Sequence, residues 1–147
     1  MKRRTSNPGP RVNYLADADV LSEPTKTRPA QSVIDWLAKH ETELFVNPVV
    51  LGEIEYGILL LPTGQRRTRL EKWFAEGIAQ LRVLEIDRET ARIWAGLLMD
   101  LKRKGRAMPV KDSLIAATAR QYGLTVATRN THDYRQAGVK LVNPFKA

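Results

Sequence analysis

The chain has 147 residues, 43% of them hydrophobic, and a formal net charge of +8. These values predict one folded domain with a real hydrophobic core and exclude a fully disordered chain. The lack of cysteine excludes disulfides and thiolate zinc sites, and two histidines are too few for a histidine-rich zinc site. Any metal is therefore expected on oxygen ligands, which suit Mg²⁺ or Mn²⁺.

The basic charge is concentrated at the start of the sequence. Residues 1–11 hold four basic residues and no acid, so half of the net charge lies there and +4 remains for the other 136 residues. We expect a disordered basic arm at 1–11 and a folded domain at 12–147. The mildly basic domain agrees with a polyanionic partner without requiring one. No apolar segment follows the basic residues, so no signal peptide is visible, and no apolar run approaches the roughly 18 residues of a membrane span. We expect a soluble cytoplasmic protein without a membrane partner.

Strands and helices are predicted to alternate along the chain. The expected elements are a strand at 12–16, a loop at 23–29, a helix at 30–39, a strand at 44–46, helices at 48–61 and 66–81, a strand at 82–86, helices at 88–104 and 109–122, a strand at 124–127, a helical turn at 131–137 and a strand at 139–142. Asn47 and Asp87 are expected to cap helix starts, and for Asp87 we prefer this role over a catalytic one. The alternation predicts an α/β fold with a mainly parallel sheet of four to five strands and helices on both faces.

Burial is predicted from the pattern of apolar residues in three of these helices. The helix at 48–61 is apolar almost all round, so we expect it to be largely buried. The helix at 88–104 is expected to bury a stripe made of Ala91, Trp94, Leu97, Leu98 and Leu101. The helix at 66–81 has a basic outer face made of Arg66, Arg67, Arg69 and Lys72. We interpret that face as solvated in preference to a nucleic-acid patch.

Two carboxylates, Asp17 and Asp19, follow the first predicted strand. If the strand continues through them, both point from the same face and repel each other. Such a pair is tolerated where a cation lies between the carboxylates or where both stay hydrated. In the alternative interpretation, Asp19 caps the next turn and Asp17 is solvated.

Two further carboxylates, Glu53 and Asp112, can meet Asp17 at the carboxyl edge of the sheet, where open α/β sheets form their sites. Glu53 lies in an apolar helix, where a buried glutamate is rare unless it is paired, for instance with an arginine, or bound to metal. Asp112 lies in the first turn of an alanine-rich helix, where it either joins a site or only caps. Together the three carboxylates predict a Mg²⁺ or Mn²⁺ site that activates water and binds phosphate oxygens.

Four segments resemble, in the same order, the motifs of PIN-domain toxins of the VapC type, in particular of the FitB-like branch. They are DADVLSE at 17–23, LGEI at 51–54, PVKDSLIAATA at 109–119, and VATRN at 126–130 together with NPF at 143–145. The resemblance covers roughly residues 14–145. It implies a PIN-like three-layer fold and a metal-dependent endoribonuclease, the toxin half of a toxin–antitoxin pair. It also implies a homodimer and a cognate antitoxin that inserts a segment into the acidic groove, with operator DNA reached only through that antitoxin.

The sequence departs from the family pattern at two positions. Asp19 stands where the family usually has asparagine, and Asn130 stands where a fourth acid is often found, with Asp133 three residues later. We therefore expect one metal on Asp17, Glu53 and Asp112, with Asp19 or Asp133 as an additional ligand. Asn130 is expected to orient water or a ligand, with support from Thr128 or Ser22. A PIN-fold module that binds RNA or the antitoxin without cleaving RNA remains an alternative, and a DNA nuclease or phosphatase is a weaker one.

Overall fold

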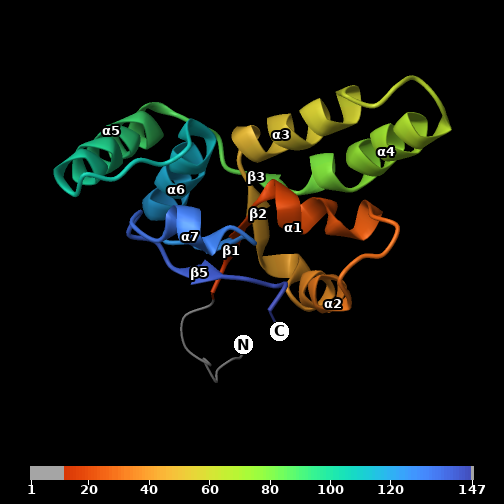
Figure 1. Cartoon of the computed structure of the whole chain (residues 1–147), viewed down its shortest axis with the longest axis horizontal. Helices are drawn as coiled ribbons and strands as arrows, with labels where there is room; N and C mark the ends of the chain where they lie inside the picture. The colour runs from red at the N-terminus through yellow and green to blue at the C-terminus, as the bar shows by residue number, and fades with distance from the viewer. Residues whose placement is uncertain (1–11, 147) are drawn as a thin grey trace, which may run out of the picture.

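The computed structural model describes residues 12–146, and the predicted basic arm at 1–11 lies outside them. Its middle layer is a five-stranded sheet in the order β3-β2-β1-β4-β5, and every neighbouring pair is parallel (Figure 1). The strands are β1 (Tyr14–Ala16), β2 (Leu44–Val46), β3 (Arg82–Val83), β4 (Thr125–Ala127) and β5 (Leu141–Val142). The predicted α/β class and parallel sheet are confirmed.

Helices cover both faces of the sheet. They are α1 (Ala18–Ser22), α2 (Gln31–Lys39), α3 (Pro48–Leu59), α4 (Gln65–Glu76), α5 (Arg88–Arg103), α6 (Val110–Tyr122) and α7 (Thr131–Tyr134), with 3₁₀ turns η1 (Glu23–Thr25), η2 (Glu41–Glu43) and η3 (Ile78–Gln80). The chain steps outward from β1 to β3 in one direction and from β4 to β5 in the other. With right-handed crossovers, α1 to α4 lie on one face and α5 to α7 on the other (Figure 1). No helix within residues 12–146 is both long and apolar enough to span a bilayer.

The strand order reverses between β1 and β4, which is the position where open α/β sheets form a crevice at the strands' carboxyl ends. Asp17 directly follows β1, and Thr128 directly follows β4. The Asp17 N–H donates a 2.9 Å hydrogen bond to the carbonyl of Ala127, so the two strand ends are held side by side. The fold therefore places a buried carboxylate at its switch point.

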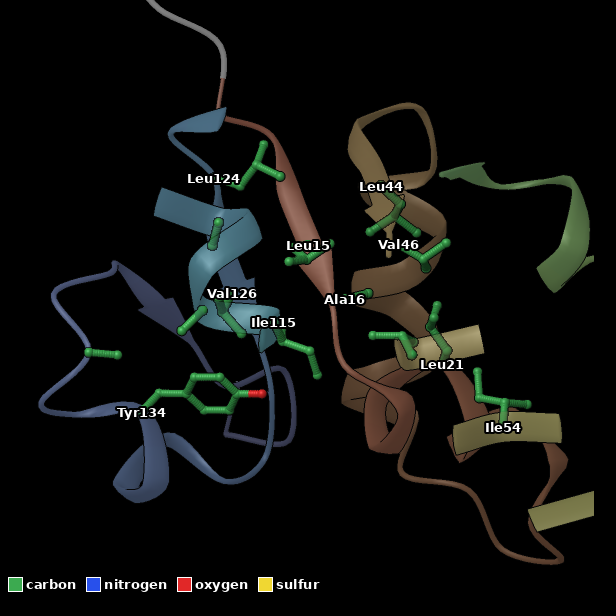
Figure 2. Packing of buried hydrophobic residues seen from close by; sticks show 14 of the residues in the cluster. Leu15, Ala16, Leu21, Leu44, Val46, Ile54, Ile115, Leu124, Val126 and Tyr134 are labelled. Carbon is green, nitrogen blue, oxygen red and sulfur yellow. The ribbon is translucent and has the colours of Figure 1, made fainter. Parts of the chain in front are cut away.

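The core lies between the sheet and its helices, as Figure 2 shows for Leu15, Val126 and Ile115. Helix α6 lies close to the sheet because its alanines are small, and Ala116 and Ala117 are fully buried. Both predicted caps are confirmed. Asn47 accepts from the Val50 N–H at 3.1 Å, and its amide donates to Thr118, which ties α3 to α6. Asp87 forms a capping box with Thr90.

Several local predictions are wrong. The predicted helix at 66–81 ends at Glu76, because the chain turns at Gly77 into η3. The predicted loop at 23–29 begins with η1, and α1 was not predicted as a helix. Helix α3 buries one face through Val50, Ile54 and Ile58, while the face opposite exposes Tyr56, Leu59 and Leu60. In α5 the predicted stripe is buried at Leu97 and Leu101 only, whereas Trp94 is half-buried and Ala91 and Leu98 are exposed.

Candidate active site

Asp17 is the most buried carboxylate at the switch point, with 5% of its surface exposed. It is the N-cap of α1: Oδ1 accepts from the Ala18 N–H at 2.8 Å, and Oδ2 accepts from the Thr128 hydroxyl at 2.8 Å. Burial raises the pKa of Asp17 above the usual range. The prediction that Asp17 and Asp19 share one face of a strand is wrong, because β1 ends at Ala16. The alternative, with Asp19 as the cap and Asp17 solvated, is also wrong.

Asp19 lies in the first turn of α1 and is half-buried. Its Oδ2 accepts from the Arg129 N–H at 3.1 Å. Its Oδ1 is buried and has no hydrogen-bond partner among residues 12–146. Burial, followed by the neighbouring charge of Asp17, raises the pKa of Asp19 to about 6. Asp19 therefore adds a poorly compensated carboxylate next to Asp17.

Asp112 is joined to Asp17 through a tyrosine. The Tyr134 hydroxyl lies 3.3 Å from Asp17 Oδ2 and 3.4 Å from Asp112 Oδ1. Burial, then the charge of Asp17, raises the pKa of Asp112 to about 6. Tyr134 is fully buried, and burial raises its pKa so far that the phenol keeps its proton and acts as a donor. In Figure 2 its ring lies in the core with the oxygen pointing inward from α7.

Glu53 lies on α3 with 23% of its side chain exposed. Its Oε2 pairs with Lys111 Nζ at 2.9 Å, so the cation that pairs with it is a lysine of α6 and not the predicted alternative, an arginine. Its Oε1 is buried without a hydrogen-bond partner in the described chain. The hydrogen bond with Glu53 is the largest cause that raises the pKa of Lys111, and the charges of Asp112 and Asp17 add to it. Lys111 is thus an ammonium beside several carboxylates.

Asn130 and Asp133 lie at the rim, and both are exposed. The Asn130 N–H donates to the Thr128 hydroxyl at 3.1 Å, while its carboxamide makes no hydrogen bond to the described residues. The charge of Asp133 contributes to the raised pKa of Asp112, so Asp133 faces the same side of the sheet edge. Thr128 is the supporting hydroxyl, because it donates to Asp17. The Ser22 hydroxyl makes no such bond within residues 12–146; only the Ser22 carbonyl accepts, from Thr25.

We call Asp17, Asp19, Glu53 and Asp112 together the acidic site. The charge of Glu53 raises the pKa of the other three carboxyls, and two buried oxygens, Asp19 Oδ1 and Glu53 Oε1, lack partners among the described residues. Oxygen donors of this kind fit a hard divalent cation such as Mg²⁺ or Mn²⁺. As they stand within residues 12–146, no three Asp, Glu or His side chains are gathered tightly enough to coordinate one ion.

The sequence did not reveal the roles of Tyr134 and Lys111, and Tyr134 is the harder of the two to find. It is a single aromatic residue on a helix of four residues, where no periodicity distinguishes a core tyrosine from one that contacts a site. The one available signal is its place four residues after Asn130, in a short turn that follows β4. That signal is visible only once the sheet edge is known.

Known proteins match nearly the whole chain. The PIN domain family matches residues 14–139. Two curated relatives are the VapC ribonuclease Y4jK of Sinorhizobium fredii, 34% identical over 90% of this chain and 97% of the relative, and the toxin FitB of Neisseria gonorrhoeae, 33% identical over 89% and 97%. The crystal structure of FitAcB from Neisseria gonorrhoeae has a TM-score of 0.86 and 32% identity, covering 91% of this chain and 99% of that one. The chain therefore belongs to the PIN-domain family, in its VapC and FitB-like branch.

Proposed function

We propose that this chain is a Mg²⁺- or Mn²⁺-dependent endoribonuclease and the toxin half of a toxin–antitoxin pair. The observation that carries the proposal is the acidic site at the switch point, where the Tyr134 hydroxyl lies between Asp17 and Asp112. Buried like charges that raise each other's pKa are a feature of functional sites. The names of two relatives support the chemistry, since one is a VapC ribonuclease and the other is a toxin.

In this proposal Asp17, Glu53 and Asp112 hold the metal, with Asp19 or Asp133 as an additional ligand. When bound, the ion supplies an activated water and stabilises the charge that develops on the scissile phosphate. Thr128 and Tyr134 fix the position of Asp17 by donating to its Oδ2. The Asn130 carboxamide makes no hydrogen bond to residues 12–146 and lies at the rim, where it orients water or the RNA backbone.

The partners follow from the same family membership and from the surface. We propose RNA as substrate, a cognate antitoxin that covers the acidic groove, and a homodimer in the cytoplasm, with operator DNA contacted only through the antitoxin. Large apolar side chains are exposed on two helices, one on each face of the sheet, and such exposure supports protein partners there. They are Tyr56, Leu59 and Leu60 of the α3 segment, and Leu98 and Met99 of α5. Light scattering on the purified chain measures whether it self-associates.

The experiment is a cleavage assay on bulk RNA with Mn²⁺, with EDTA, and with Mn²⁺ restored after EDTA. The proposal predicts fragments with Mn²⁺, intact RNA with EDTA, and fragments again after restoration. Single-stranded and duplex DNA in parallel reactions test the DNA-nuclease alternative. Asn130 in place of an acid favours the second candidate, a PIN-fold module that binds RNA without cutting it. Bound but uncut RNA under every metal condition would support that module and contradict the enzyme.

A further inference from the structure

A basic cavity lies beside the acidic site on the far side of α7. It has a volume of about 260 Å³ and is lined by Arg106, Met108, His132, Asp133, Arg135 and Gln136, together with Ala107. Three of these side chains carry or can accept a positive charge, and one carries a negative charge. No motif of the sequence marks this group, because its members come from the segment before α6, from α7 itself and from the residues that follow α7.

The two arginines of this cavity are free to bind a ligand. Neither Arg106 nor Arg135 forms a salt bridge within residues 12–146, whereas Arg67, Arg92 and Arg120 each pair with a carboxylate of their own surroundings. Both side chains are exposed, so their guanidinium groups keep all their donors available to solvent. A guanidinium presents its donors in a planar fork that matches two oxygens of a phosphate.

The cavity adjoins the acidic site through α7. Asp133 lines the cavity, and its charge also acts on Asp112. The next residue, Tyr134, turns the other way and reaches Asp17 and Asp112 with its hydroxyl. The residue after that, Arg135, lines the cavity again. The short α7 segment thus contributes residues to the cavity on either side of the tyrosine that contacts the carboxylates.

The negative charge of the acidic site disfavours binding of RNA, and positively charged side chains nearby would offset this effect. Several carboxylates repel a polyanionic strand, and a divalent cation offsets only part of that charge. Arginines next to the site attract the neighbouring backbone and fix its position relative to the carboxylates. We propose that the Arg106–Arg135 cavity is a subsite that binds one phosphate of the RNA substrate next to the phosphate at the acidic site. This inference rests on the proposed ribonuclease function.

A second cavity of similar volume, about 280 Å³, provides a matched control. It is lined by Pro24, Thr25, Leu70, Trp73 and two arginines, Arg66 and Arg69. These arginines are exposed and form no salt bridge in the described part of the chain, so the two cavities carry the same pair of charges. None of the residues that line this second cavity contributes to the raised pKa values of Asp17, Asp19 and Asp112, whereas Asp133 of the first cavity contributes to that of Asp112. Comparing the removal of Arg106 and Arg135 with the removal of Arg66 and Arg69 therefore distinguishes a specific subsite from a general effect of net charge.

The test measures binding of a fluorescein-labelled single-stranded RNA by anisotropy between 50 and 300 mM NaCl, with the full chain carrying Asp112→Asn so that RNA stays intact. In that background, Arg106→Gln with Arg135→Gln should weaken binding by roughly tenfold at 100 mM NaCl. It should also reduce the slope of log K against log salt by about 0.7, the value for one phosphate contact on a single strand. The RNA affinity of Arg106→Lys with Arg135→Lys should lie between that of the parent chain and that of the glutamine pair. Lysine keeps the positive charge but lacks the planar fork of donors. Arg66→Gln with Arg69→Gln should change affinity by less than about twofold.

Equal losses in the two glutamine pairs, or no loss in either, would overturn the subsite. The second result would also be expected if the cavity accepted an acidic protein segment and not RNA. Thermal melts check that each variant is folded, which the exposure of all four arginines favours. Because binding is measured without cleavage, the two proposals fail separately. A selective loss of RNA binding in a chain that never cuts RNA keeps the subsite and rejects the enzyme. RNA cleavage by the wild-type chain with unchanged binding in the Arg106 and Arg135 variants keeps the enzyme and rejects the subsite.

Discussion

The Tyr134 hydroxyl lies 3.3 Å from Asp17 Oδ2, although the two residues are 117 positions apart in the sequence. The same hydroxyl is 3.4 Å from Asp112 Oδ1. A phenol has one proton, so it donates to one carboxylate at a time and leaves the other less well compensated. This shared donor explains why the two carboxylates can be held close together and still remain available to a cation.

Tyr134→Phe should therefore weaken both the fold and the site. Removal of a buried hydroxyl that donates to a carboxylate costs about 2 kcal/mol, and the melting temperature should fall by roughly 4–8 °C. Loss of a group that orients metal ligands should lower metal affinity or RNA cleavage by about tenfold to a hundredfold. Tyr122→Phe on α6 is the control, since Tyr122 is 45% exposed and lies away from the site. If Tyr134→Phe cleaves RNA at the wild-type rate, the hydroxyl does not position the carboxylates.

The metal-free protein should become more stable as the pH falls from 7.5 to 5. The pKa values of Asp19 and Asp112 are about 6 in the folded chain, above the ordinary value of 3.8. The folded state therefore binds protons more tightly than the unfolded state, and each group destabilises the fold at pH 7.5 by about 1 kcal/mol after solvent screening. Glu23 and Asp87 have lowered pKa values and therefore stabilise the folded state. This stabilisation is lost only below about pH 4, so it does not affect the change between pH 7.5 and 5.

Urea denaturation in EDTA at pH 7.5, 6 and 5 measures this effect, with a rising midpoint as the expected result. The double variant Asp19→Asn and Asp112→Asn should show a flatter profile, because two of the three carboxyls with a raised pKa are gone and only Asp17 remains. A midpoint that falls steadily from pH 7.5 to 5 in the wild-type chain would contradict the assignment. Mn²⁺ affinity should change in the opposite direction and weaken as the pH falls through 6, since protons compete for the same oxygens.

Lys111→Gln should tighten Mn²⁺ binding. Lys111 Nζ lies 2.9 Å from Glu53 Oε2 and acts as a resident cation beside the acidic site. Removal of one positive charge near a divalent ion should raise its affinity by roughly tenfold. The metal-free fold should lose less than about 1 kcal/mol, because the Lys111 side chain is 61% exposed.

Isothermal titration calorimetry with Mn²⁺ gives the affinity directly for this comparison. Lys39→Gln, at the last residue of α2 and near the amino end of β2, removes the same charge from the opposite edge of the sheet. It should leave the affinity unchanged. Equal or weaker Mn²⁺ binding in Lys111→Gln would show that the ammonium does not compete with the ion.

Asp19→Asn should keep RNA cleavage at saturating Mn²⁺ and require several-fold more Mn²⁺ to reach it. The asparagine oxygen can still accept from the Arg129 N–H, as Asp19 Oδ2 does at 3.1 Å. The metal-free melting temperature should rise, because a buried carboxylate oxygen without a partner among the described residues is replaced by a neutral group. Complete loss of turnover at every Mn²⁺ concentration would identify Asp19 as an indispensable ligand.

The sequence predicted the parts of the fold that local chemistry decides. The alternation of strands and helices, and the caps at Asn47 and Asp87, depend on patterns within a few residues of each position. The end of β1 did not follow from such a pattern. Asp17 could continue a strand or cap a helix, and the choice depends on Thr128, 111 residues away, which holds its carboxylate at the strand end.

Burial was harder to predict than helix position. Helix α3 is apolar on several faces, but one chain supplies a covering layer for only one of them, so Tyr56, Leu59 and Leu60 remain exposed. The acidic site was also predicted only in part. Asp17, Glu53 and Asp112 were expected from charge in apolar surroundings, whereas the roles of Tyr134 and Lys111 depend on which elements meet at the sheet edge. Only the folded arrangement brings those elements together.

The most direct test of the acidic site is the paired behaviour of Asp112→Asn in thermal melts and RNA cleavage, each with and without Mn²⁺. Asparagine is nearly isosteric and suits the first turn of α6, so the fold should persist, with a metal-free melting temperature equal to or above that of the wild type. Mn²⁺ should raise the melting temperature of the wild type and have little effect on the variant, and only the wild type should cut RNA. The structure does not support a capping role for Asp112, because the N-cap of α6 is Pro109 and no side chain caps this helix. Cleavage by Asp112→Asn at the wild-type rate would therefore show that Asp112 does not hold the ion and that the proposed metal site does not exist.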